Sequence, residues 1–434
     1  MGIRNLNRFI QSKCPEASAR IHLKDLTGKK IAVDTSIYMY RYAGEGALLE
    51  NMYLMASLFR HYNIHAVFVF DGIPPPQKTD IIELRRKKKE QAKKQYDTIA
   101  ELVAQKKRDS TSSDIDITGI ADLEESMREL KKQFARLRDC DIANVKELVV
   151  SFGFAIIDAE GEADVLCAKL SVKKRVYACL SDDTDMFVYG CPIVLRHISL
   201  LNHSVVSYDT ADILKTLTLT QQEFKMMCVV SGTDYTMRPT QSNVAASASA
   251  SLESVYQKLL KYKSLPYKDQ RKYHDSGGGF YDWYIQRGNG TTGTGASEPL
   301  DKSAITYLSN EAMFDTMTGT DQYKQLVILN RDDIHKKRIV EIMMKEDFIF
   351  IEPKPSDHKI IQTLISGNAS LTSSPLYGVG AWDDNVLGVS PEEKQASIIA
   401  NDVYGIHATS YKELQHKVRE TKPRRIGGGG GGVD

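Results

Sequence analysis

The chain has 434 residues, 26% of them charged and 42% hydrophobic, which is ordinary for a globular protein and enough for a large core and two domains. Its formal net charge of +1 averages over segments of strong opposite charge and identifies no partner. The cysteines stand singly without a C-x-x-C pair, which argues against a disulfide framework or zinc ribbon and favours a reducing compartment. No apolar run approaches the ~18 residues of a membrane helix, and the N-terminus MGIRNLNRFIQSK lacks a signal-peptide core, so we expect a soluble intracellular protein.

Three segments are predicted to form buried parallel strands. Residues 29–36, 65–72 and 174–183 are short β-branched or aromatic runs that lead into Asp, and helix-like sequence separates them. Strands alternating with helices indicate an α/β domain with a mostly parallel central sheet flanked by helices. In such a sheet, ligands bind at the carboxyl ends of the strands, where this sequence places Asp34, Asp71, Asp183 and Asp185.

A long insertion separates the second predicted strand from the third. Its first part carries seven Lys or Arg residues between Arg85 and Lys94 against a single Glu. After the polar stretch KKRDSTSSDID, apolar residues step by three and four, as in an amphipathic helix, at Ile120, Leu123, Met127, Leu130, Phe134 and Leu137. We expect a helical hairpin or arch at about 78–140 that projects over the sheet edge. The alternative is an ordinary solvated pair of charged helices.

The chain after residue 265 carries less information. The stretch SGGGFYDWYIQRGNGTTGTGASEPL predicts a linker or long loop, and no Lys-Ser/Thr follows its glycines as in a phosphate-binding loop. Parts of 304–352 are helix-like, including HKKRIVEIMMKEDF, and TKPRRIGGGGGGVD predicts a flexible tail. We therefore expect one domain over 1–265, which includes the arch, and a region 266–434 of unassigned role with a Gly-rich tail.

Further acids follow the strand-end aspartates along the chain. Glu162 and Asp164 precede a helix-like segment, and Asp234 follows another apolar segment. Taken singly, these acids are explained by helix capping or turn formation. Taken together, several would converge at one sheet edge, where their uncompensated charges repel one another. Magnesium or manganese would remove that cost, and two such ions ~4 Å apart form the usual centre for phosphodiester hydrolysis.

Six segments in chain order resemble the flap endonuclease and XPG family of structure-specific 5′ nucleases. They are MGIRNL, IAVDTSIYMY, VFVFDGIPPPQK, GEADVLCA, LSDDTDMFVYG and VSGTDY, and they span residues 1–235. Each segment alone is a weak signal, whereas six in order are specific. The resemblance implies a PIN-like α/β 5′-nuclease fold with a helical arch, and two Mg²⁺ ions per active site for which Mn²⁺ can substitute.

The resemblance also implies a role for each acidic residue. Five would hold or orient the catalytic metal near the scissile phosphate, namely Asp34, Asp71, Glu162, Asp164 and Asp183. Asp185 and Asp234 would complete the site and position the second ion. Asp182, between the two metal-facing aspartates of its loop, would point elsewhere.

Basic and aromatic residues match the family pattern as well. Lys78 and Arg85 lie two helical turns apart and would stabilise charge on the scissile phosphate, unless they are merely two members of a basic helix. Tyr40 would stack on a base beside the cleaved bond, unless it is a core aromatic. Other residues would contact DNA near the active site or line the opening for a single-stranded 5′ end, namely Gly2, Arg4, Arg86, Lys87 and Lys88.

Several features depart from the family pattern. The stretch RPTQSNVAASASASLESVYQKLLKYKS has no glycine where relatives carry a Gly-x-Gly hairpin that grips duplex phosphates with a potassium ion, although its Ser and Asn residues could cap a helix. Asp164 stands where flap endonucleases carry Glu, the wedge segment 41–54 is short, and the arch is long. The tail lacks the sliding-clamp motif Q-x-x-[ILM]-x-x-[FY]-[FY]. These differences indicate a divergent member, for which a virus is one candidate source.

The leading hypothesis is a divalent-metal-dependent nuclease that cuts branched or flapped DNA at 5′ flaps or 5′ ends during replication, repair or recombination. It would act as a monomer, without a membrane, in the nucleus or at a site of viral DNA replication. One alternative is a nuclease-like DNA-binding scaffold, which the altered hairpin permits but which has no need of seven repelling acids. The other is a phosphatase with Asp34 as nucleophile, which requires a second Asp at the position of Ser36.

Overall fold

The computed structural model describes residues 2–3, 5–109, 117–233, 251–275, 277–288, 304–316, 328–345, 348–351 and 407–410. Its centre is a seven-stranded sheet with the strand order β1-β7-β6-β5-β2-β3-β4. Strands β6, β5, β2, β3 and β4 run parallel, whereas β7 and β1 add an antiparallel edge. The strands are β1 (Ser18–His22), β2 (Lys30–Asp34), β3 (His65–Phe70), β4 (Ala155–Asp158), β5 (Ala178–Leu180), β6 (Ile193–Ser199) and β7 (Ser204–Asp209). The predicted α/β class with a mostly parallel sheet is confirmed.

All three predicted strands are present but shorter than expected. In the third, only Ala178–Leu180 is extended, because the preceding residues form the turn that leaves a helix, with Lys174 at a φ of 55°. The sequence did not reveal the other four strands of the seven-stranded sheet, β1, β4, β6 and β7. The antiparallel edge strands β1 and β7 include polar residues and have mixed burial, so they lack the continuous apolar run by which β2 and β3 were recognised.

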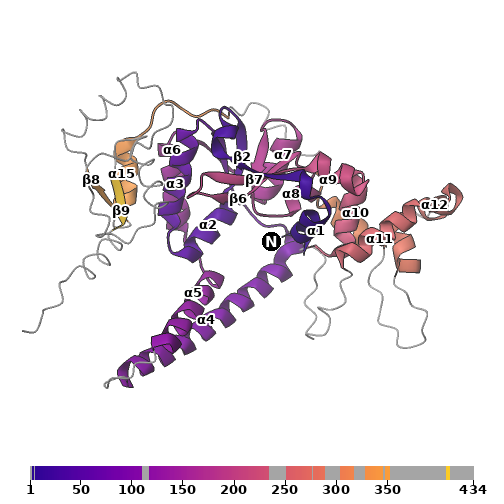
Figure 1. Cartoon of the computed structure of the whole chain (residues 1–434). Coiled ribbons are helices and arrows are strands. Elements are labelled where there is room, and N and C mark those ends of the chain that lie inside the picture. Colours follow the sequence, from indigo (N-terminus) through magenta and orange to yellow (C-terminus); the bar gives the residue numbers. More distant parts are fainter. Residues whose placement is uncertain are drawn as a thin grey trace, which may run out of the picture.

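Helices cover both faces of the sheet, and alternate residues of the central strands point to opposite sides (Figure 1). Ile31 and Val33 of β2 pack with α2 (Thr35–Glu45), α3 (Leu48–His61), α6 (Asp139–Ser151) and α15 (Lys336–Met344). Ala32 faces the second core, which is formed by α1 (Leu6–Lys13), α7 (Ala163–Val172), α8 (Asp185–Val188), α9 (Thr210–Leu217), α10 (Gln221–Ser231) and α11 (Leu252–Lys263). Both faces of the central strands are therefore buried.

Two long helices, α4 (Thr79–Asp109) and α5 (Ile117–Gln133), project together from the body of the protein (Figure 1). The rings of Tyr96 of α4 and Phe134, which directly follows α5, meet edge to face with centroids 5.4 Å apart. The predicted pair of helices is present. Its second helix ends at Gln133, however, so Phe134 and Leu137 follow the helix instead of continuing its stripe.

Segments beyond residue 265 contribute to the same cores. In α13 (Phe280–Trp283), Phe280 and Trp283 are 2% and 3% exposed, so the prediction of a linker is wrong for this aromatic stretch. Glycines flank the segment, but its rings pack against α10 and α11. The other elements here are α12 (Tyr267–His274), α14 (Ala304–Ala312), β8 (Phe348–Ile351) and β9 (His407–Ser410).

The predicted division at residue 265 stays a prediction, and the glycine-rich tail lies outside the described residues. The helix-like stretch HKKRIVEIMMKEDF contains α15, as predicted. Among the described residues, no helix combines the length and apolar character needed to cross a membrane.

Candidate metal centre and nucleic-acid interface

The strand ends that carry the predicted acids are neighbours at one edge of the sheet. Asp34 is the last residue of β2, Asp71 follows β3, and Asp183 follows β5 by three residues. Because β2 pairs in parallel with both β3 and β5, these ends point the same way. Register places Asp34 opposite Val69, two residues before Asp71. The sheet topology therefore brings acids that are far apart in sequence together at one edge of the sheet, as predicted. We call this the acidic edge.

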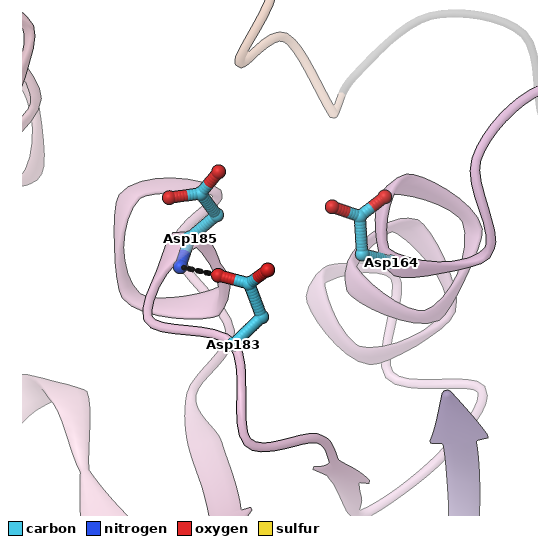
Figure 2. Close-up of side chains that lie close together, drawn as sticks. All are labelled: Asp164, Asp183 and Asp185. Atoms are coloured by element: carbon cyan, nitrogen blue, oxygen red, sulfur yellow. Dashed lines mark hydrogen bonds between the residues drawn. The ribbon is translucent and has the colours of Figure 1, made fainter. Parts of the chain in front are cut away.

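Three carboxylates form the centre of this edge (Figure 2). Asp164 in the first turn of α7 faces Asp185 at the start of α8. Asp183 lies on the loop that joins β5 to α8. One oxygen from each carboxylate lies within 4.8 Å of the others. Asp183 and Asp185 are only 7% and 1% exposed. A divalent cation at this point could accept one oxygen ligand from each of the three.

A network of short hydrogen bonds fixes the loop that presents Asp183 and Asp185. The Ser181 hydroxyl donates to Asp34 Oδ2 at 2.8 Å and accepts the Asp183 backbone N–H at 3.1 Å. The Asp185 N–H donates to Asp183 Oδ1 at 3.1 Å. Ser181 thereby ties the end of β2 to the loop after β5. Sequence analysis missed this role, because a serine beside three aspartates is also a common turn residue.

Asp71 and Glu162 flank the three carboxylates in different environments. An Asp71 carboxylate oxygen accepts the Ala163 N–H at the start of α7 at 2.8 Å. Glu162 Oε1 is 2.7 Å from the ammonium of Lys78, which ends the short 3₁₀ turn Pro76–Lys78 before α4 and is 7% exposed. Lys78 is therefore a buried cation on the rim of the acidic edge, rather than one more solvated residue of the basic helix.

The crowding of acids changes their protonation equilibria. Burial, followed by the negative charge of Asp71, raises the pKa of Asp34 to about 7, although the hydrogen bond from Ser181 opposes the shift. Burial also raises the pKa of Asp164 well above its ordinary value, and the charge of Glu162 adds to it while Lys78 counteracts it. Such shifts show that the charged forms are costly here without a counterion. The all-oxygen set fits a hard divalent cation, which would offset that cost.

Asp182 points away from the cluster, as the family pattern implied. Its carboxylate accepts the His197 N–H at 2.7 Å and lies 3.4 Å from the guanidinium of Arg41. Arg196, on β6 and 4% exposed, donates from Nη2 to the Asp182 carbonyl at 2.7 Å. Its Nη1 donates to Asn7 of α1 at 2.6 Å. Arg196 therefore connects the ligand loop to the N-terminal helix, a role for which the sequence offered no signal.

The N-terminal segment lies directly against the metal-facing loop. Gly2 has a φ of 79°, and a Cβ built on it would come within 2.6 Å of both Asp185 Oδ1 and Thr184 Oγ1. The Thr184 hydroxyl donates to the Ile3 carbonyl at 3.4 Å. Only glycine fits this close approach with a left-handed backbone. The predicted Gly2 is thus placed beside the acids, whereas Arg4 and Asp234 lie outside the described residues.

The predicted DNA-contacting cations lie on the surface of α4. Arg85, Arg86, Lys87 and Lys88 are exposed in its first turns. Arg86 and Lys87 lie 3.8 and 3.1 Å from Glu90 and Glu83 of the same helix. Exposed pairs of this kind contribute little to stability, so phosphates could replace them at little cost.

Tyr40 of α2 is 47% exposed, which makes it a surface residue rather than a core aromatic. The Lys89 ammonium lies 4.8 Å from the centroid of the Tyr40 ring, so a residue of α4 contacts this part of α2. A half-exposed ring beside a cation is suited to stacking on a nucleic-acid base.

The region of the missing glycine hairpin is described only at its end. Residues 234–250 lie outside the described residues, and α11 begins directly after Ser251. The Ser251 hydroxyl accepts the Ser254 N–H at 3.2 Å, so a serine does cap this helix, as the sequence suggested.

Comparisons with known proteins give consistent matches. The XPG N-terminal domain matches residues 1–92, and the XPG I-region matches residues 153–234. The chain is 27% identical over 284 residues to Probable RAD2-like endonuclease 369L of Invertebrate iridescent virus 6, which covers 54% of this chain and 67% of that protein. It is 30% identical over 254 residues to Flap endonuclease 1 of Meyerozyma guilliermondii, and this match covers 54% of this chain and 63% of that protein. The chain therefore spans about two thirds or less of the length of these relatives.

Among solved structures, the catalytic core of Rad2 in complex with DNA substrate matches 77% of this chain and 88% of its own at 20% identity. The TM-score of this match is 0.42.

Proposed function

Because this chain belongs to the family of the XPG N-terminal domain and XPG I-region, we propose that it is a structure-specific 5′ nuclease. It would hydrolyse DNA phosphodiester bonds at 5′ flaps or 5′ ends. The observation that carries the proposal is the buried set Asp164, Asp183 and Asp185, with oxygens within 4.8 Å of one another at the carboxyl edge of a parallel sheet. Neither a phosphatase with Asp34 as nucleophile nor a DNA-binding scaffold accounts for this set.

The metal-binding residues are proposed from the family resemblance, which the closeness of Asp164, Asp183 and Asp185 supports. Asp34, Asp71, Glu162, Asp164 and Asp183 would hold or orient the catalytic metal, and Asp185 and Asp234 would complete the site and position the second ion. Two Mg²⁺ ions, or Mn²⁺ in their place, would activate a water and stabilise the leaving oxygen. Ser181 and Arg196 would keep the ligand loop in place through the bonds described above.

Lys78 and Arg85 would stabilise charge on the scissile phosphate. The Lys78 ammonium is already positioned beside the acidic edge by Glu162, so a phosphate held there could attract it away from that carboxylate. Arg85 lies on the exposed surface of α4, two helical turns along from Lys78. Both residues would contribute mainly in the transition state, where negative charge is redistributed around phosphorus.

The projecting helices α4 and α5 would form an arch for the single-stranded 5′ end. Arg86, Lys87 and Lys88 would contact its phosphates, and Tyr40 would stack on a base near the cleaved bond. Gly2 and Arg4 would bring the N-terminus close to the same DNA. The substrate would therefore be branched or flapped DNA, bound by a monomer.

The cellular setting is proposed from the substrate. A nuclease for 5′ flaps or 5′ ends would act in DNA replication, repair or recombination, in the nucleus or at a site of viral DNA replication. The matched viral endonuclease is compatible with either setting.

The test is cleavage of a labelled double-flap DNA, a nicked duplex and a free single strand by the purified chain, with Mg²⁺ or with chelator. Mg²⁺-dependent release of the intact flap would support a 5′ flap endonuclease, and stepwise short products from the nick would indicate a 5′ exonuclease. Intact binding without cleavage of any of the three would contradict the proposal and favour the scaffold.

A further inference from the structure

A second charged surface lies at the opposite end of the strands that carry the acids. It consists of Lys29, Lys30, Lys173, Lys174 and Arg175, and all five side chains are exposed. We call these five residues the basic end patch. No acidic residue interrupts either of its two runs in the sequence. The acids lie at or just after the carboxyl ends of β2 and β5, whereas the basic end patch lies just before or at the start of the same two strands.

Strand pairing brings the two runs of the basic end patch together. β2 and β5 are hydrogen-bonded neighbours, with Ile31 opposite Ala178, and the Tyr177 N–H donates to the Lys30 carbonyl at 2.7 Å. The Lys29 ammonium lies 4.9 Å from the centroid of the Tyr177 ring, which is 43% exposed. A half-exposed aromatic ring therefore lies within the cluster of positive charge.

Local structural needs explain only part of this surface. Lys173, Lys174 and Arg175 follow the last residue of α7, where cations interact favourably with the helix dipole. That explanation does not extend to Lys29 and Lys30, which belong to a different element. Among the described residues, the recorded ion pairs include none that involves Lys29, Lys30 or Lys174.

We propose that the basic end patch docks an acidic peptide segment of a partner protein, one rich in Asp and Glu with an apolar or aromatic residue for Tyr177. This goes beyond the proposed nuclease activity and does not depend on it. DNA held at the acidic edge would have to pass around the whole domain to reach the basic end patch. A short acidic segment matches its compact footprint, because neighbouring strand starts are only about 5 Å apart. Docking there would leave the acidic edge open.

The test measures binding of a fluorescent 15-residue Asp/Glu-rich peptide with one central Phe to the full chain by anisotropy at physiological salt. The double variant Lys30→Glu/Lys174→Glu is expected to weaken binding at least about tenfold, equivalent to ~1.4 kcal/mol. The matched control Lys215→Glu/Lys261→Glu makes the same change in net charge at exposed sites of α9 and α11 and is expected to change binding less than about twofold.

Cleavage of the double-flap DNA separates this inference from the proposed function. The Lys30→Glu/Lys174→Glu variant is expected to cut at the rate of the unaltered chain and to bind flap DNA equally well. Equal loss of peptide binding in the two double variants would show only a general charge effect and would overturn the docking site. Loss of flap binding in the patch variant alone would assign these cations to DNA and overturn it as well.

Discussion

The acidic edge and the segment from Arg85 to Lys94 of α4 both carry dense charge, mainly of one sign, but they hold it in opposite ways. At the acidic edge, Asp183 is buried and its loop is fixed through Ser181 to the neighbouring strand. On α4, Arg86 and Lys87 are exposed and pair with carboxylates of their own helix. Metal ligation requires oxygens at set positions, whereas a surface that binds the phosphate backbone of DNA requires mainly positive potential. The comparison predicts that changes at the edge affect cleavage rate and changes on α4 affect affinity.

The largest effect is expected from Asp183→Asn. Loss of one central carboxylate should lower the single-turnover cleavage rate on the order of 10³-fold, because the proposed metal centre would stabilise charge on both reacting oxygens. Binding of flap DNA should stay within about twofold. Asp212→Asn, an exposed acid on α9, is the control and should cleave normally. A normal rate for Asp183→Asn would mean that the edge does not hold the catalytic metal.

Lys78→Ala should rank second, with a loss of about 10²–10³-fold in cleavage rate and little change in DNA affinity. The control is Lys94→Ala, an exposed cation of the following helix α4, which should weaken affinity and leave the single-turnover rate almost unchanged. If Lys78→Ala weakened binding instead, Lys78 would belong with the phosphate contacts of α4.

Arg196→Met tests whether the ligand loop must be held in position. Because Arg196 bonds the Asp182 carbonyl and Asn7, its loss should weaken Mg²⁺ affinity about 10- to 100-fold. Calorimetric Mg²⁺ titration of the DNA-free protein measures this. Arg196→Lys should recover part of the affinity, whereas Arg20→Met, an exposed arginine of β1, should leave it unchanged. Unchanged Mg²⁺ affinity in Arg196→Met would remove Arg196 from the support of the site.

The smallest change in rate is expected from Lys87→Gln/Lys88→Gln on α4. Two lost contacts with the phosphates of the single-stranded 5′ end should reduce the slope of log affinity against log salt by about 1.4. The single-turnover rate at saturating enzyme should remain within about twofold, because both side chains are exposed on α4 and would contribute to binding rather than to the reaction. An unchanged salt slope would mean that DNA does not follow this face of the helix.

Sequence patterns identified the strands that carry the site but not their neighbours. β2 and β3 are continuous apolar runs, because both of their faces are buried, and such runs are visible in one sequence. The antiparallel edge, β7 and β1, has mixed burial and no comparable signal. The buried ring cluster of α13 was hidden by the glycines around it, since its burial depends on partners in α10 and α11.

The same difference applies to the site. Asp34, Asp71, Asp183 and Asp185 could be predicted, because parallel strands place their carboxyl ends at one edge regardless of side-chain detail. The roles of Ser181 and Arg196 could not, since each depends on a hydrogen bond across more than one element. The ion pair that buries Lys78 against Glu162 likewise exists only once α7 and the start of α4 are brought together.

The most direct test of the account is thermal unfolding of the DNA-free protein and of Asp183→Asn, each with and without Mg²⁺. If the acidic edge is a divalent-metal centre, Mg²⁺ at a hundred times its dissociation constant should stabilise the unaltered chain by about 2.7 kcal/mol and Asp183→Asn much less. Without Mg²⁺, the variant should unfold at the same or a higher temperature, because one repelling charge is gone. An unaltered chain indifferent to Mg²⁺, with a variant that is less stable in its absence, would show that the carboxylates serve the fold and not a metal.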